Sequence, residues 1–140
     1  MPTAKKILVV DDERGLRYLL SDVLTSEGFE VRMAKDGQES LDQLRGRRFD
    51  LVITDIQMPR LDGIEMLKVM KKRGRKEKVI IMTGNPTDRR LSGTDMPQVM
   101  SHLQKPIQID AFLEAVVAAM ATTRKVSKKK TRTKPSKTTG

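Results

Sequence analysis

The chain has 140 residues, 33% of them charged, and it contains no cysteine and one histidine. This length is enough for one domain with a buried core. The missing cysteines exclude disulfides and thiolate metal sites, and the single histidine excludes a multi-histidine site. No apolar run approaches the roughly 18 residues of a membrane-spanning helix, and the N-terminus lacks the layout of a secretory signal. We therefore expect a cytoplasmic protein without a membrane span.

The formal net charge of +10 is unevenly distributed along the sequence. Residues 122–140 contain eight Lys or Arg and no acid, whereas the rest of the chain has 20 Lys or Arg against 18 Asp or Glu. The last segment is also poor in apolar residues, so it cannot bury enough surface to offset the entropy of ordering. The sequence predicts a near-neutral domain over residues 1–123 and a basic, disordered tail over residues 124–140.

Five short apolar runs, several rich in β-branched residues, are typical of buried strands. In chain order, the predicted strands are Lys5–Val10, Glu30–Ala34, Asp50–Thr54, Lys78–Met82 and Ser101–Gln104.

Apolar residues at helical spacing lie between these strands. The first helix is expected to stop at Gly28 and the third near Gly74. The connection after the fourth strand contains Pro86, Gly93 and Pro97, so only a short or irregular helix is expected, near residues 88–92. Asp110 is the expected cap of the last helix.

Alternating strands and helices predict right-handed βαβ units and a parallel sheet. In such sheets, ligands bind beyond the carboxyl ends of the strands. Asp11 and Asp12 follow the first strand, Asp55 follows the third, and Lys105 follows the last. We therefore expect three carboxylates and one ammonium group to meet at one edge.

Three neighbouring carboxylates repel one another unless a cation lies between them. Oxygen ligands of this kind favour Mg²⁺, with Mn²⁺ as a substitute. Such a site, with the ammonium of Lys105 and the hydroxyl of Thr83, can neutralise and orient a phosphoryl group. Asp55 is then the expected nucleophile, forming an acyl phosphate.

Several motifs occur in one order along most of the domain. They are Val9-Val10-Asp11-Asp12-Glu13, Thr54-Asp55-Ile56-Gln57-Met58-Pro59, Asp62-Gly63, Met82-Thr83-Gly84 and Lys105-Pro106. In this order and spacing, the chain resembles the response-regulator receiver domain family of two-component signalling, from about Lys5 to Ala121.

The resemblance implies a flavodoxin-like, doubly wound α/β fold: a five-stranded parallel sheet of order 2-1-3-4-5 with five flanking helices. It implies phosphorylation of Asp55 and Mg²⁺ binding by Asp12, Asp55 and the backbone carbonyl of Gln57, with Asp11 acting partly through water. Thr83 and Lys105 would contact the phosphoryl group, and the Lys105–Pro106 peptide would be cis. Phosphorylation and dephosphorylation would be self-catalysed, so the chain would be a phosphoacceptor rather than an enzyme.

The sequence departs from the family pattern near the expected switch. Family members usually have Tyr or Phe three residues before the lysine, where this chain has His102. The fourth helix is also replaced by the Pro- and Gly-containing connection. The coupling of Thr83 to residue 102, and the usual output surface, could therefore differ here.

The expected phosphate donor is a histidine kinase or a histidine phosphotransfer protein. Output would pass through an unknown downstream protein, through relay to a phosphotransfer protein, or through the tail. An alternative is an anionic-polymer binder in which the tail binds nucleic acid weakly and without sequence preference, and the fold is a scaffold. A phosphatase of the haloacid dehalogenase type fits less well, because Asp11-Asp12-Glu13 is not Asp-x-Asp.

Overall fold

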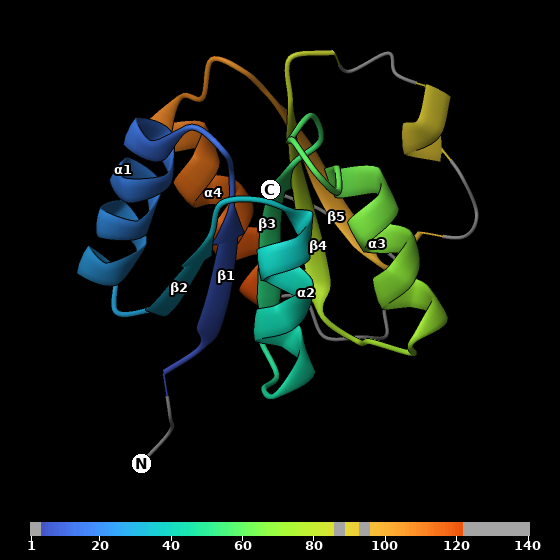
Figure 1. Cartoon of the computed structure of the whole chain (residues 1–140). Coiled ribbons are helices and arrows are strands. Elements are labelled where there is room, and N and C mark those ends of the chain that lie inside the picture. The colour runs from blue at the N-terminus through green and yellow to red at the C-terminus, as the bar shows by residue number, and fades with distance from the viewer. Residues whose placement is uncertain (1–3, 86–88, 93–95, 122–140) are drawn as a thin grey trace, which may run out of the picture.

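The computed structural model describes residues 4–85, 89–92 and 96–121 (Figure 1). The predicted basic tail lies outside these residues, as do Pro86, Asp88 and Gly93 of the irregular connection.

The described chain forms one parallel sheet of order β2-β1-β3-β4-β5. This confirms the predicted doubly wound, flavodoxin-like α/β fold, and each predicted strand lies within two residues of an observed one. The strands are β1 (Lys6–Val10), β2 (Glu30–Ala34), β3 (Leu51–Asp55), β4 (Lys78–Thr83) and β5 (Val99–Gln104).

Helices cover both faces of the sheet (Figure 1). Leu8 and Val10 of β1 belong to the hydrophobic core beneath α2 and α3, whereas Ile7 and Val9 belong to the core beneath α1 and α4. Successive side chains of a strand point to opposite faces, so a strand that is covered on both sides must be continuously apolar. The helices are α1 (Arg14–Ser26), α2 (Gly37–Arg45), α3 (Gly63–Lys72) and α4 (Ile109–Ala121).

The helix ends largely follow the sequence signals. Gly28 and Gly74 have positive φ angles of 94° and 72° just beyond α1 and α3, as expected for residues that stop a helix. The expected cap at Asp110 is wrong by two positions. Helix α4 already includes Ile109, and the Phe112 amide donates to the Gln108 carbonyl. Asp110 lies instead in the first turn, where its charge favours the helix dipole.

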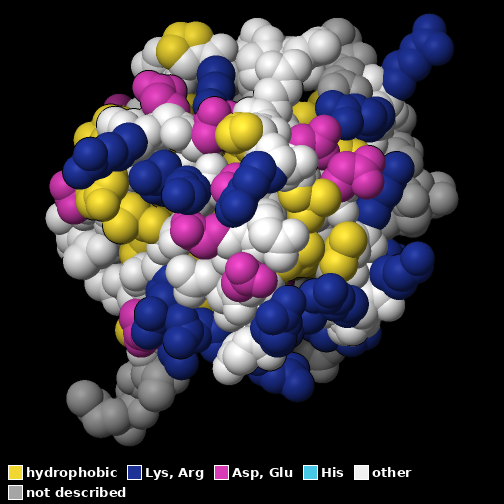
Figure 2. All heavy atoms as spheres, in the orientation of Figure 1, with side chains coloured by type: hydrophobic (Ala, Val, Ile, Leu, Met, Phe, Trp, Pro, Cys, Tyr) yellow, Lys and Arg dark blue, Asp and Glu magenta, His cyan; other side chains and the backbone are white. Residues whose placement is uncertain are grey.

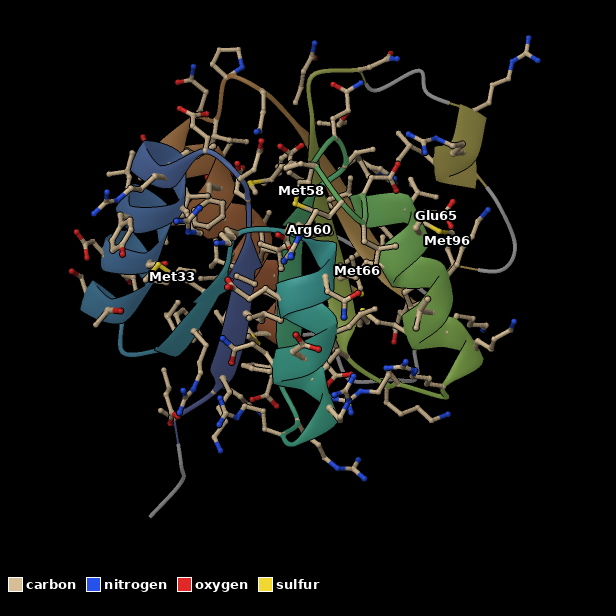
Figure 3. All side chains as sticks on the ribbon, viewed as in Figure 1. Met33, Met58, Arg60, Glu65, Met66 and Met96 are labelled. Atoms are coloured by element: carbon tan, nitrogen blue, oxygen red, sulfur yellow. The ribbon has the colours of Figure 1, made fainter. Side chains whose placement is uncertain are left out.

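The connection between β4 and β5 forms only a short 3₁₀ helix, η1 (Arg89–Ser92), among its described residues. This agrees with the expected short, irregular helix and replaces the fifth flanking helix implied by the resemblance. Leu91 and Met96 pack against the core that includes Met66 and Met70 of α3, and Met96 is seen beside α3 in Figure 3. The connection is therefore anchored on α3.

Candidate functional site

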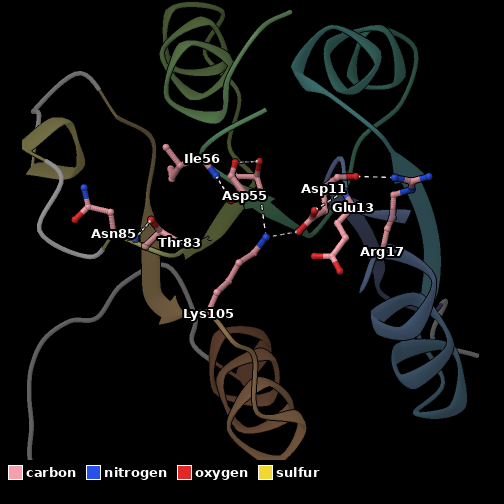
Figure 4. A network of polar contacts seen from close by, with 9 residues as sticks. Asp11, Glu13, Arg17, Asp55, Ile56, Thr83, Asn85 and Lys105 are labelled. Carbon is pink, nitrogen blue, oxygen red and sulfur yellow. Dashed lines mark hydrogen bonds and ion pairs between the residues drawn. The ribbon is translucent and has the colours of Figure 1, made fainter. Parts of the chain in front are cut away.

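Four of the predicted site residues meet at the carboxyl edge of the sheet (Figure 4). Asp11 directly follows β1, Asp55 ends β3, Thr83 ends β4 and Lys105 directly follows β5. Because the strands are parallel, their ends bring together residues that are far apart in the sequence.

Lys105 links the two buried acids. Its Nζ lies 2.8 Å from Oδ2 of Asp55 and 3.1 Å from Oδ2 of Asp11. The Lys105 amide also donates to the Thr83 carbonyl at 2.9 Å, and the Lys105–Pro106 peptide is cis, as the resemblance implied. The ammonium group is thus held between the two carboxylates by its own bonds to them.

Asp11 is fully buried. Its Oδ1 accepts from the Glu13 amide at 2.8 Å, and its carbonyl accepts from Arg17 Nη1 at 2.7 Å. Burial raises the pKa of the Asp11 carboxyl above its usual value, although the Glu13 amide and Lys105 oppose this rise. Burial alone would lower the pKa of Lys105. The hydrogen bonds of Lys105 to Asp55 and Asp11 outweigh this effect, so its pKa is raised above the usual value.

Asp55 is buried, and its side chain keeps 9% of its surface exposed. Its Oδ1 accepts from the Ile56 amide at 2.7 Å and its Oδ2 bonds Lys105. The following loop returns tightly, because the Gly63 amide donates to the Ile56 carbonyl at 2.7 Å. A β-carbon at Gly63 would overlap the Asp55 carbonyl oxygen, so only glycine fits there.

The carboxylates of Asp11, Asp12 and Asp55 fit a divalent cation. Each offers one oxygen, and these three atoms lie within 4.8 Å of one another. Asp12 is exposed and lines an open pocket. Arg60 lines the same pocket. Gln57 is exposed in the loop after Asp55. A hard, oxygen-binding ion such as Mg²⁺ suits this donor set.

Thr83 is buried at the end of β4, and its Oγ1 accepts from the Asn85 amide at 2.9 Å. His102 is exposed on the edge strand β5, in register with Ile81. It lies outside the cluster of potential metal ligands found among the described residues. The structure therefore brings Thr83, but not His102, to the acidic edge.

Sequence reasoning missed two arginines around this edge. Arg17 holds the Asp11 carbonyl, as described above. Arg60, which has a positive φ of 67°, donates through Nε to Oδ2 of the buried Asp36 at 2.9 Å. Asp36 also caps α2 through the Glu39 amide. An Asp-Gly pair before a helix is a local sequence signal, but nothing local points to its partner 24 residues later.

The profile of the Response regulator receiver domain family matches residues 7–117. This chain belongs to that family. The match also decides against the haloacid dehalogenase alternative. The receiver domain is 38% identical over 112 residues to Sporulation initiation phosphotransferase F of Bacillus subtilis, with 80% of this chain and 90% of that protein covered.

A second relative is Response regulator MprA of Mycolicibacterium vanbaalenii, which is 34% identical over 119 residues. That alignment covers 84% of this chain but 51% of MprA, so this receiver chain spans about half the length of that relative.

Solved structures of receiver proteins have the same fold. A CheY-like receiver domain protein from Methanospirillum hungatei superposes with a TM-score of 0.78 at 26% identity, covering 85% of this chain and 95% of that one. Response regulator TrrA from Thermotoga maritima, solved in complex with Mg²⁺-BeF, gives 0.70 at 32% identity, covering 82% and 98%. Among the described residues, no helix of this receiver domain has the length and apolar character to span a membrane.

Proposed function

We propose that this receiver domain accepts a phosphoryl group on Asp55 and signals through the resulting conformational change. The observation that carries the proposal is the environment of the Asp55 carboxylate: it ends the central strand β3, bonds Lys105 at 2.8 Å and clusters with Asp11 and Asp12. In the transfer, a carboxylate oxygen of Asp55 forms the bond to phosphorus as the bond to the donor breaks.

The donor would be a histidine kinase or a histidine phosphotransfer protein, as family membership suggests. The similarity to a sporulation phosphotransferase supports a place in a phosphorelay. Downstream, the phosphorylated domain would act on a protein partner or pass the group on. It would catalyse its own phosphorylation and dephosphorylation without turning over a substrate as an enzyme does.

Asp12, Asp55 and the Gln57 carbonyl would hold Mg²⁺, with Asp11 acting partly through water. The bound ion would neutralise the carboxylates and the incoming phosphoryl oxygens. The Mg²⁺-BeF complex of TrrA supports this assignment. Lys105 would supply a fixed positive charge, and the Thr83 hydroxyl would donate to a phosphoryl oxygen.

The Thr83 hydroxyl accepts from the Asn85 amide and still has its own proton to donate to a phosphoryl oxygen. A shift of Thr83 toward the phosphoryl group would pull on the Asn85 amide and so bias the connection that begins at Asn85, as in switches that reorder a segment. His102, exposed on the edge strand, would change its position less than a buried aromatic residue would.

The test is intact mass after incubation with Mg²⁺ and acetyl phosphate. The wild type should gain one phosphoryl group and Asp55→Asn none. Asp42→Asn, which changes an exposed acid on α2, should behave as the wild type. Stoichiometric labelling of Asp55→Asn would refute the site, and failure of the wild type with acetyl phosphate and with histidine kinases would refute the function.

A further inference from the structure

The amino-terminal edge of the sheet, opposite the acidic cluster, is strongly basic. It contains the connections leading into β3 and β4. Segment 45–50 has three Lys or Arg and segment 71–78 has six, against two acids in total. Figure 2 shows Lys and Arg side chains gathered over the lower part of the visible face, below α2 and α3. The near-neutral average of the domain conceals this separation of charge.

The two acids offset only part of the positive charge of this edge. Glu77 is buried and accepts from Arg75 Nε at 3.1 Å and Nη2 at 2.5 Å, and from the Phe49 amide at 3.0 Å. Asp50 accepts from the Lys6 amide at 2.7 Å. Glu77 therefore compensates Arg75, and the exposed Asp50, which lines the same cavity as Glu77, offsets one further charge. Since the two segments hold nine Lys or Arg, seven positive charges stay in excess.

Three of these cations have exposed side chains without a partner. Arg48, Arg73 and Lys76 are exposed, and within the described part of the chain no side-chain hydrogen bond or ion pair engages them. Cations in the last turn of a helix can be explained by the helix dipole. Arg48 and Lys76 lie in the connections beyond the helix ends, so helix stability does not account for them.

These side chains border a groove rather than a flat surface. Two adjoining cavities, of about 350 and 320 Å³, share Arg73 and Arg75 as lining residues. Arg75 is fixed by bonds from its guanidinium to the carbonyls of Leu44 and Arg47, both at 2.8 Å. The groove between the ends of α2 and α3 is thus built on a wall that the bonds of Arg75 fix. Glu77 compensates the charge of Arg75, so the excess positive charge comes from the cations that border the groove.

The basic tail joins the chain at the same edge. Helix α4 ends at Ala121, and Lys78 at the start of β4 donates from Nζ to the Ala119 carbonyl at 2.7 Å. The first of the eight tail cations, Arg124, follows three residues after Ala121. The end of α4, after which the tail continues in the sequence, therefore lies on the same edge as this groove and on the opposite edge from Asp55.

We propose that the groove lined by Arg45, Arg48, Arg73 and Lys76, here called the basic groove, binds the phosphate backbone of a nucleic acid. The near-neutral average charge of the domain led us to expect anion binding by the tail alone. The basic groove assigns anion binding to the domain as well. Phosphate contacts of this kind are independent of sequence and weaken steeply with salt. The chain has one tyrosine, three phenylalanines and no tryptophan. Phe49 lines the groove but is buried, so base stacking would contribute little.

The surface favours a nucleic acid over a membrane or a protein partner. A protein interface usually has an apolar centre, and membrane insertion needs an apolar anchor. Leu41, Leu44 and Met70 line part of the groove, but all three are buried and offer little apolar surface to a partner. The exposed large apolar residues of the described chain are Tyr18, Leu19 and Val117, on α1 and α4, none of which lines the groove. A strand of phosphates can enter a groove, whereas a flat bilayer would meet only its rim.

The test measures binding of the full chain to a duplex DNA of about 30 base pairs by fluorescence anisotropy at several salt concentrations. The groove variant is R48Q/R73Q/K76Q. The matched control, R14Q/R32Q/R89Q, removes the same charge from exposed residues elsewhere. A tail variant changes all eight tail Lys and Arg to Gln. Thermal unfolding of each variant checks that it is folded.

The groove variant should lose about tenfold or more in affinity, and its slope of log K against log salt should fall by about 2 to 3 in magnitude. The control should lose much less affinity. The tail variant should still bind DNA, and adding the groove substitutions to it should remove this remaining binding. Equal losses in groove and control variants, or no binding by the wild type at low salt, would overturn the proposal. Stronger groove-dependent binding to vesicles with 30% anionic phospholipid than to DNA would assign the groove to membranes instead. None of these outcomes depends on Asp55 chemistry.

Discussion

Nη1 of Arg90 in η1 lies 2.8 Å from Oδ2 of Asp62, the residue that caps α3 through the Glu65 amide. Burial acts to raise the pKa of Asp62, but the Glu65 amide and Arg90 outweigh it and hold that pKa below its usual value. The ion pair therefore ties the irregular connection after Thr83 to the helix that follows Asp55. The ion pair thus connects the helix that follows the proposed phosphorylation site, Asp55, to the segment that is proposed to respond to phosphorylation.

Arg90→Ala should loosen η1 without unfolding the domain. Because the Arg90 side chain is 41% exposed, the pair should contribute less than about 1 kcal/mol to global stability. Hydrogen exchange of amides 89–92 should nevertheless accelerate several-fold. Arg45→Ala, which breaks the exposed Arg45–Asp42 pair at 3.5 Å, should leave these amides unchanged. Unaltered exchange in Arg90→Ala would show that the ion pair with Asp62 does not hold η1 in place.

Mg²⁺ affinity should depend on Asp12 more than on Asp11. Asp12 is exposed and free to turn toward an ion, whereas the oxygens of Asp11 already bond the Glu13 amide and Lys105. Titration should give a loss of about tenfold or more for Asp12→Ala and a smaller loss for Asp11→Ala, with Asp42→Ala as the control. An equal or larger loss for Asp11→Ala would contradict this assignment.

Asp11→Asn should be more stable than the wild type at pH 7 in the absence of metal ions. Burial raises the pKa of Asp11 in the folded chain, so the folded state holds this proton more tightly than the unfolded state. The wild type therefore loses stability as the pH rises from about 4 through the raised pKa, and the loss is complete above it. The variant lacks this carboxyl.

Denaturant unfolding between pH 4 and 7 measures the difference in stability between the wild type and Asp11→Asn directly, since the two proteins share all other titrating groups. The advantage of Asp11→Asn should grow with pH across this range. An advantage that is constant, or that shrinks as the pH rises, would mean that burial does not dominate the energetics of Asp11.

Gly63→Ala should destabilise the domain by about 1–3 kcal/mol, the usual cost of overpacking. The added β-carbon would overlap the Asp55 carbonyl, and a backbone atom cannot move aside as a flexible side chain can. Gly46→Ala is the matched control, since nothing lies within 4 Å of its β-carbon and its φ is −108°. Chemical denaturation measures both, and similar stabilities would show that the loop after Asp55 adjusts freely.

The sequence by itself determined the order of the elements and the edge at which the candidate site lies. Strand identity followed from short apolar runs, and the positions of Asp11, Asp55 and Lys105 just at strand ends are local facts of the chain. In a parallel sheet such ends must meet, so their convergence needed no coordinates. Helix stops at Gly28 and Gly74 were equally local, because a positive φ is a property of one residue.

The tertiary structure decided which side chains pair and where charge collects. Lys105 and Asp55 bond across 50 residues, and Arg60 reaches Asp36 across 24. Arg75 joins Glu77 to the carbonyls of Leu44 and Arg47, forming the wall of the basic groove. The composition of the domain as a whole is nearly neutral, so it gave no sign of this local excess of positive charge. Ion pairs and electrostatic surfaces depend on distance and burial, which are set only when separate segments pack together.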